Sequence, residues 1–251
     1  MDSGELAMAL FGTIVDALAI ILGSIIGLFW RNINENMKAT ILQALSITVL
    51  VIGIDMALEA NSILIIVVAS LALGSMLGEK WDIEDKMNHF GIWLETKTGA
   101  TEGGAAAAFV TATLVYVVGA VSVIGALDSG LRNDHTVLLT KALIDGVLAI
   151  FLTSTMGIGI MFSAVSVFLF QGAIALSASQ INRFIQPDLM DDIIIAITGT
   201  GGVMIIAIGI RLLGILNIRV ANMLPAILFA VLFVVIQYYW ETISLFFIQI
   251  F

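Results

Sequence analysis

Six charged side chains lie inside, or at the edge of, long apolar runs of this sequence, where a charge is costly. These residues are Asp16, Asp55, Asp128, Lys141, Asp145 and Arg211. A charge at the centre of a membrane helix costs about 2.5–3.5 kcal/mol on insertion scales, so such residues usually bind an ion, carry a proton or form an ion pair. We therefore take them as the first candidates for chemistry.

Asp16 and Asp145 lie in similar surroundings, IVDALAIIL and LIDGVLAIF. Two carboxylates at membrane depth could bind a cation or carry a proton along a polar path. Lys141 gives a second interpretation, because it precedes Asp145 by four residues and therefore lies on the same face of a helix. An ion pair within one helix would account for both of them, and Asp16 could pair with a helix end or a base near the interface. Both interpretations stay open at this point.

A second pair of charges lies in two segments of the chain that are similar to each other in sequence. The segments IGIDMALEAN, residues 52–61, and IGIRLLGILN, residues 208–217, share their first three residues and their last. Asp55 and Arg211 take the same place in the two segments. Opposite charges at matching positions predict an ion pair that locks the two segments together, because either charge alone would be costly to bury.

The segment Thr198–Gly202 combines two threonine hydroxyls with three glycines inside an apolar run. Each glycine costs about 1 kcal/mol relative to alanine within a helix. The pattern predicts an unwound turn whose carbonyls and hydroxyls bind an ion, as in the broken helices of transporters. Close helix packing by small residues is the alternative. Gln171, in the predicted span 159–180, adds a further polar side chain at membrane depth. The candidate ligands for an ion or substrate are Asp16, Asp145, Gln171, Thr198, Gly199, Thr200 and Gly201.

The composition requires these residues to lie in a membrane protein. Apolar residues make up 60% of the 251 residues and charged residues 12%, and the mean hydropathy is +1.12. A soluble domain carries charge on about a quarter of its residues. A membrane helix needs about 20 apolar residues, so we expect a single all-α transmembrane domain over residues 1–251. Its spans are predicted at about 9–30, 40–58, 62–78, 105–127, 137–157, 159–180, 192–215 and 220–240.

The division of residues 137–180 is the least regular part of this assignment, and we place it at Gly157-Ile158-Gly159. The similarity between residues 52–61 and 208–217 predicts an inverted repeat, with repeats over residues 9–78 and 159–240. Such repeats are typical of many transporter folds. The small-residue spacings Gly23/Gly27 and Gly74/Gly78 predict close helix contacts, within one chain or between two copies in a homo-oligomer.

The charges outside the apolar runs predict an orientation. Basic residues follow the first, third and seventh spans, whereas Arg132 and Arg183 alone lie in the opposite loops. Since basic loops stay in the cytoplasm, both termini are expected outside. The polar segment 79–104 is then predicted to be an amphipathic helix at the cytoplasmic interface, or alternatively a helix that docks a partner. The tail after Trp240 is too short to span and is expected along the interface.

Several function classes are excluded by what the sequence lacks. There is no cysteine, so thiolate metal sites and disulfides are ruled out, and the two histidines lack metal-ligand spacing. No phosphate loop or nucleophile motif occurs. A net charge of −9 without a concentrated basic face argues against nucleic-acid binding. We expect no enzyme activity, no cofactor and no bound metal.

The ordered segments FGTIVDALAIILGSIIGLFW, VIGALDSGL, TKALIDGVLAIFLTSTMGIGIMFSAVSVFLFQG and TGTGGVMIIAIGIRLLGI resemble one family. It is the prokaryotic membrane family of domain of unknown function 554, the YqgA/YdfK-like proteins. The resemblance implies a polytopic inner-membrane protein of bacteria or archaea, and it implies no activity.

The residues themselves favour a transporter or channel for a small ion or solute, with the lipid bilayer as its surroundings. The motivation is the coincidence of buried charges, a glycine-rich helix and a candidate inverted repeat. The alternative is a membrane sensor or scaffold that does not transport and that docks a partner through residues 79–104.

Overall fold

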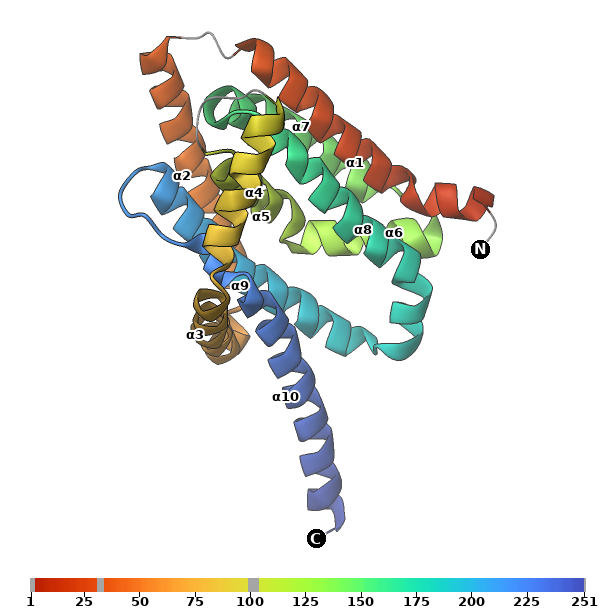
Figure 1. Cartoon of the computed structure of the whole chain (residues 1–251). Coiled ribbons are helices and arrows are strands. Elements are labelled where there is room, and N and C mark those ends of the chain that lie inside the picture. The colour runs from red at the N-terminus through yellow and green to blue at the C-terminus, as the bar shows by residue number, and fades with distance from the viewer. Residues whose placement is uncertain (1–2, 31–33, 99–103, 251) are drawn as a thin grey trace.

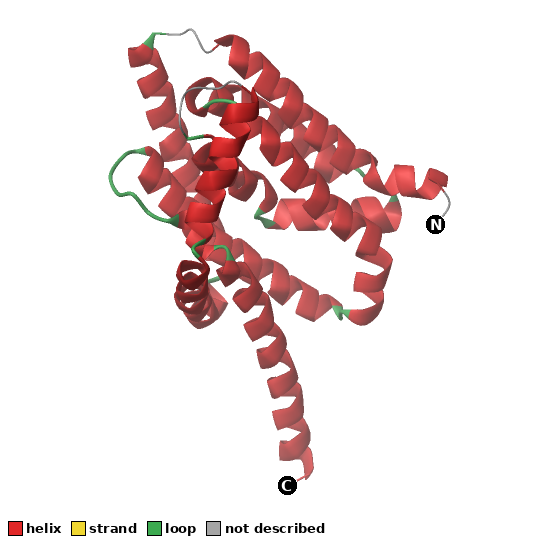
Figure 2. Ribbon diagram, viewed as in Figure 1, coloured by secondary structure: helices red, strands yellow, loops and turns green. Residues whose placement is uncertain are grey.

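The computed structural model describes residues 3–30, 34–98 and 104–250, and in these ranges the chain is built from helices without any strand (Figures 1 and 2). Short 3₁₀ turns at Asn61–Ile63 and Val220–Met223 precede α3 and α10. The described ranges hold ten α-helices, which are α1 (Ser3–Phe29), α2 (Glu35–Glu59), α3 (Leu64–Trp81), α4 (Ile83–Thr98), α5 (Ala105–Val117), α6 (Ala120–Arg132), α7 (Thr136–Met156), α8 (Gly159–Phe184), α9 (Pro187–Leu212) and α10 (Pro225–Ile250).

Within the described ranges, seven helices are long and apolar enough to cross a membrane, and the bent pair α5–α6 makes an eighth. The predicted all-α fold of about eight membrane helices is therefore confirmed. The predicted division of residues 137–180 is also confirmed, because α7 ends at Met156 and α8 begins at Gly159. Gly157 makes this turn with a φ of 87°, a backbone conformation that favours glycine.

The pair α5–α6 is a broken span and not the single helix over 105–127 that the sequence predicts. The two helices meet at 60°, and Gly119 joins them with a φ of 141°. The start of α5 packs on Gly159, at the start of α8, while Gly130 of α6 packs on Ala175. These two levels of α8 are sixteen residues, or about 24 Å, apart, so the pair traverses the bundle and does not turn back.

The bundle is organised by helix pairs that pack through small residues. In α1, Gly12 faces Leu138 and Gly27 faces Ile150, so α1 and α7 run parallel along most of their length. In α3, Gly74 faces Ala226 at the start of α10, and Gly78 faces Asn222 in the 3₁₀ turn before it. The predicted spacings Gly23/Gly27 and Gly74/Gly78 thus serve contacts within one chain. A homo-oligomer stays a prediction.

The predicted unwound turn at Gly199–Gly202 is wrong, because α9 is one continuous helix from Pro187 to Leu212. A Cβ on Gly199 would overlap the Ala60 side chain, and a Cβ on Gly201 would overlap Val118. A Cβ on Gly202 would lie 2.5 Å from the backbone nitrogen of Ala57. These glycines therefore let α2 and the α5–α6 junction approach α9 closely, which offsets their cost in helix propensity.

The helices α2 and α9 run antiparallel with a register that agrees with the predicted repeat. Gly53 packs against Ile206, and Gly209 packs against Leu50. The segments that begin at Ile52 and Ile208 are 156 residues apart, and the same offset relates Gly53 to Gly209 and Leu50 to Ile206. The two contacts are thus reciprocal, as a two-fold axis between the segments would require. The inverted repeat as a whole stays a prediction.

The polar segment 79–104 contains the separate helix α4, which packs on α5 and on the 3₁₀ turn Val220–Met223. Residues 99–103 of this segment lie outside the described ranges. After Trp240, α10 continues without a break to Ile250 and leaves the body of the bundle (Figure 1). The expected position of this tail along the interface stays a prediction.

We predict that Gly202→Ala lowers the free energy of unfolding by about 1–3 kcal/mol, the usual cost of forcing a methyl group into a packed interface. The measurement is the thermal unfolding of the purified protein in detergent. Gly172→Ala is the matched control, since a Cβ there lies 3.4 Å from the flexible end of Leu10. Equal unfolding temperatures for the two variants would contradict the packing role of Gly202.

Candidate functional site

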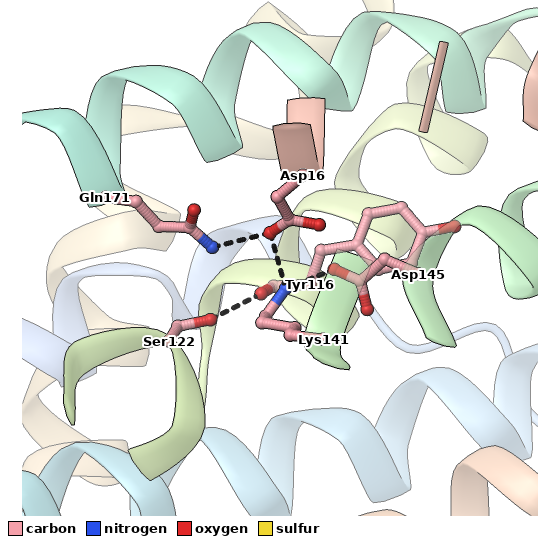
Figure 3. Close-up of polar contacts among 6 residues, drawn as sticks. All are labelled: Asp16, Tyr116, Ser122, Lys141, Asp145 and Gln171. Atoms are coloured by element: carbon pink, nitrogen blue, oxygen red, sulfur yellow. Dashed lines mark hydrogen bonds and ion pairs between the residues drawn. The ribbon is translucent and has the colours of Figure 1, made fainter. Parts of the chain in front are cut away.

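Lys141 lies between two carboxylates in the interior of the bundle (Figure 3). Its Nζ is 3.1 Å from Oδ2 of Asp16 on α1, and it forms a direct ion pair with Oδ2 of Asp145 on its own helix, α7. The exposed fractions are 0% for Asp16, 7% for Lys141 and 5% for Asp145. The structure thus joins the two sequence interpretations, because the ion pair within α7 also reaches the carboxylate on α1.

Gln171 adds a third helix to this cluster. Its Nε2 donates a hydrogen bond of 2.7 Å to the Asp16 Oδ2 that also accepts from Lys141. Gln171 lies on α8 and is fully buried. We call Asp16, Lys141, Asp145 and Gln171 the charge cluster. It forms because α1 packs between α7 and α8 along its buried face, which carries Thr13, Asp16, Ala17 and Ile20 at helical spacing.

The end of α5 lies beside the charge cluster. The Lys141 Nζ is 5.9 Å from the centre of the Tyr116 ring, within the range of a cation–π contact. The carbonyl of Tyr116 accepts a hydrogen bond of 2.7 Å from the Ser122 hydroxyl, which lies in the first turn of α6. Ser122 therefore satisfies one of the carbonyl groups that the break between α5 and α6 leaves without a helical partner.

A cavity of about 560 Å³ reaches the charge cluster. Its walls come from α2, the α5–α6 junction, α7 and α9. Along α7 the cavity extends from Thr136, the first residue of the helix, to Leu148, a distance of about 18 Å. The polar residues of its wall are Asp55, Glu59, Tyr116, Ser122, Thr136, Thr140, Lys141, Asp145 and Thr198. Glu59 and Thr136 are exposed at the end where α7 begins.

Several buried oxygen atoms at the site have no hydrogen-bond partner in the described part of the chain. Oδ1 of Asp16, Oε1 of Gln171 and the Tyr116 hydroxyl are among them, and Thr13 and Thr198 each add a hydroxyl. Buried polar atoms in proteins are nearly always paired with protein or water. Carboxylate, amide and hydroxyl oxygens are the ligands that hard cations and protons prefer.

The formal charge of the cluster is −1, from two carboxylates and one ammonium group. The carbonyl end of α5, which carries the partial negative charge of the helix dipole, also lies at the cavity wall through Val115 and Tyr116. Both features favour a cation over an anion. No group of three or more His, Cys, Asp or Glu side chains that could hold a metal ion occurs among the residues described.

The predicted Asp55–Arg211 ion pair does not form. The Nη1 atom of Arg211 lies 2.7 Å from Oε1 of Glu84, on α4. Gly202 packs against Met56 and Ala57, which places Asp55 near the level of Gly202. Arg211 lies nine residues farther along α9, about 13 Å away along the helix. Asp55 instead lines the cavity.

Glu84 was missed by the sequence analysis because its segment was predicted to be an amphipathic helix at the interface, which gave no reason to expect a buried carboxylate. The residue is 9% exposed. Its Oε2 accepts a hydrogen bond of 2.9 Å from the backbone N–H of Ala221, and its own N–H donates one of 2.7 Å to Asn222. Glu84 and Arg211 are not part of the charge cluster around Lys141. Through its contacts, Glu84 attaches α4 to the region where α9 ends and α10 begins.

The structure brings together four of the predicted site residues and leaves others apart. Asp16, Lys141, Asp145 and Gln171 form the charge cluster, and Thr198 lines the same cavity. Gly199 and Gly201 belong to the packing of α9. Thr200 is fully buried and is absent from the cavity wall.

Tyr116, Gly119 and Ser122, at the broken helix, were missed by the sequence analysis. The one feature of the sequence that could have indicated the break is Gly119 within an apolar run. Glycines that only allow close helix packing occur in the same kind of run, so the sequence does not distinguish the two cases.

Comparison with known proteins gives three matches. A family model described as "Protein of unknown function (DUF554)" matches residues 11–235. The chain is 33% identical over 223 residues to the uncharacterized membrane protein YdfK of Bacillus subtilis (strain 168), covering 87% of this chain and 93% of that protein. It is 24% identical over 225 residues to the uncharacterized protein YqgA of Escherichia coli (strain K12), covering 87% and 94%. No solved structure matches this chain. The family match includes every residue of the charge cluster.

We predict that Lys141→Met lowers the free energy of unfolding by about 3–5 kcal/mol, because it leaves two buried carboxylates without a counter-charge. Adding Asp16→Asn and Asp145→Asn to this variant should recover most of that loss. Thermal unfolding in detergent measures both effects. A triple variant as unstable as Lys141→Met alone would show that the three residues do not act as one cluster.

The Arg211–Glu84 pair makes a separate prediction. Arg211→Met should destabilise the protein by about 1–3 kcal/mol, because Glu84 is then buried with one oxygen unpaired. Adding Glu84→Gln, which removes the buried charge but keeps an oxygen to accept from the Ala221 N–H, should restore most of the stability, whereas adding Asp55→Asn should not. A double-mutant cycle by thermal unfolding distinguishes these partners, and coupling to Asp55 in place of Glu84 would contradict the structure.

Proposed function

The chain belongs to the family described as protein of unknown function (DUF554), and we propose that it transports a small inorganic cation across the membrane. The single observation that carries this proposal is the charge cluster at the wall of the cavity, where Asp145 and Lys141 face the cavity and Asp16 lies behind them. Buried charges inside a membrane bundle commonly mark the path of an ion or a proton.

The charge of the site supports a cation as the transported species. The one buried ammonium group is already paired with two carboxylates, so the cluster has no free positive charge for an anion. The unpaired atoms of the cluster are a carboxylate oxygen of Asp16 and the amide oxygen of Gln171, and the Tyr116 hydroxyl beside the cluster is also unpaired. A sugar or other neutral solute would not require a net negative cluster, which is costly to maintain in the membrane interior.

The shape of the site supports a transporter over an open channel. The cavity reaches the bundle end at Glu59 and Thr136. Deeper in the bundle, the buried side chains of Ile20, Leu152 and Ile160 pack together. Access from one end and a packed core toward the other are features of a transporter that opens alternately to the two sides.

The broken helix and the candidate repeat also support this reading. Discontinuous helices whose ends face the substrate are common in transporters, where irregular backbone is tolerated because it lines a cavity. The junction at Val118 and Gly119 lies in the cavity wall. The reciprocal contacts of Gly53 and Gly209 agree with an inverted repeat, whose two halves would exchange roles between the two states.

The bundle end that the cavity reaches is rich in acidic residues. Asp128, Asp134 and Asp188 lie there, with Arg132 and Arg183 as the basic residues. A negative rim raises the local concentration of cations. If both termini are outside, as the basic loops predict, this end faces the exterior. The orientation is a prediction from charge alone.

The alternative function, a sensor or scaffold that docks a partner through residues 79–104, has less support. The inner face of α4 is already used within the chain, because Ile83 and Met87 pack in the core that surrounds Ile205 and Glu84 is buried. Trp81, Ile92 and Trp93 are exposed, as they would also be in a helix at the lipid interface.

Ion flux in proteoliposomes tests the proposal, with Na⁺, K⁺, Mg²⁺, Ca²⁺ and Mn²⁺ as the panel. Wild-type protein should move at least one of them, and Asp145→Asn should slow that flux by about tenfold or more, the effect of losing about 1.4 kcal/mol of binding or more. Asp85→Asn is the matched control, because Asp85 is exposed on α4 and absent from the wall of this cavity, and it should keep wild-type flux. Flux of none of these cations, or equal flux in the two variants, would contradict the proposal.

A further inference from the structure

The charge cluster is one positive charge short of neutrality. Asp16, Asp145 and Lys141 carry −1 in total, and each is at most 7% exposed. An uncompensated charge in a low-dielectric interior costs several kcal/mol. The cluster therefore favours one additional positive charge, and either a proton or a monovalent cation provides it.

We propose that a proton and a monovalent cation compete for this one place, so that the protein exchanges the two across the membrane. This inference rests on the proposed transport function and names its coupling ion. Asp145 is the residue at which they compete, because it lines the cavity whereas Asp16 does not. An ion that enters from the cavity passes the exposed carboxylates of Asp55 and Glu59 in the same wall and meets Asp145 before Asp16.

Lys141 makes the competition a switch between two pairings. Its ammonium group contacts both carboxylates. When a cation or a proton neutralises Asp145, Lys141 loses its attraction to that residue and pairs with Asp16 alone. Oδ1 of Asp16, which is buried and has no hydrogen-bond partner, is the acceptor available for this second contact.

The exchange step conserves charge and atoms. A cation M⁺ binds the Asp145 carboxylate as the carboxyl O–H bond breaks, and the proton leaves to water in the cavity. Before the step the cluster holds a neutral carboxyl group and the Lys141–Asp16 pair. After the step it holds M⁺ on the Asp145 carboxylate and the same pair. Both loaded states have a net charge of zero.

The same arithmetic explains why exchange is obligatory. The empty cluster carries −1, and a conformational change that closes the cavity around it would bury that charge without water. Only the proton-loaded and the cation-loaded clusters are neutral, so only with one of these ions bound does the protein change conformation at low cost in free energy. The protein therefore moves one proton for each monovalent cation, and the cycle transfers no net charge.

The experiment uses proteoliposomes of the full chain with an acidic interior, a pH-sensitive dye inside, and labelled Na⁺ or K⁺ outside. The expected result is that the acidic interior speeds cation uptake several-fold and that each uptake is accompanied by a rise in internal pH. Setting the membrane potential to zero with valinomycin and equal K⁺ on both sides should leave the rate of Na⁺ uptake unchanged.

Asp145→Asn gives the decisive variant, because its cluster is already neutral and requires neither ion. It should lose both the uptake and the pH change, with Asp85→Asn, on the exposed face of α4, retaining both. Cation uptake that ignores the pH gradient, or that changes with the clamped potential, would overturn the exchange and leave the transport function standing. Absence of any cation uptake by the wild-type protein would overturn both.

Discussion

The contact of Lys141 with Asp16 and Asp145 is the interaction on which the rest of the site depends. The helices α1 and α7 run parallel and pack closely, which places their two buried carboxylates near each other. Without a shared counter-charge, that arrangement would be strongly unfavourable. Lys141 supplies the counter-charge from the helix turn before Asp145, and Gln171 fixes Asp16 from the third helix. The cluster is thus held by three helices at once, and it is still one charge short of neutral.

The broken span α5–α6 gives the cluster its access to the cavity. A straight helix from Ala105 to Arg132 would pair the hydrogen-bonding groups of its own backbone. The break at Gly119 leaves carbonyl groups that need other donors, namely the Ser122 hydroxyl and water in the cavity. Membrane proteins tolerate such backbone only where it is buried in protein or lines a polar cavity. The break and the charge cluster therefore explain each other, since both need a hydrated space within the bundle.

The sequence predicted the membrane helices, the family and four residues of the cluster, because apolar runs and buried charges leave few alternatives. It could not show which glycines pack and which break a helix, and so placed the break at Gly199–Gly202 and missed Gly119. It also paired Asp55 with Arg211 by their equivalence in the repeat. In an antiparallel pair, equivalent residues meet only near the axis between the helices. This axis lies midway between the Gly53–Ile206 and Leu50–Gly209 contacts, at about residues 51–52 and 207–208, and Asp55 and Arg211 lie on opposite sides of it.

The central claim, that the charge cluster borders a water-filled cavity, is tested most directly by cysteine accessibility, since the chain has no cysteine of its own. Ile144 and Leu143 are adjacent on α7 and both exposed, at 57% and 75%, but only Ile144 lines the cavity. In lipid vesicles, Ile144→Cys should react with a charged thiol reagent that cannot cross the membrane, and from one side only, while Leu143→Cys should stay unmodified in lipid. Equal reactivity of the two thiols, or no reaction at Ile144→Cys from either side, would contradict the account.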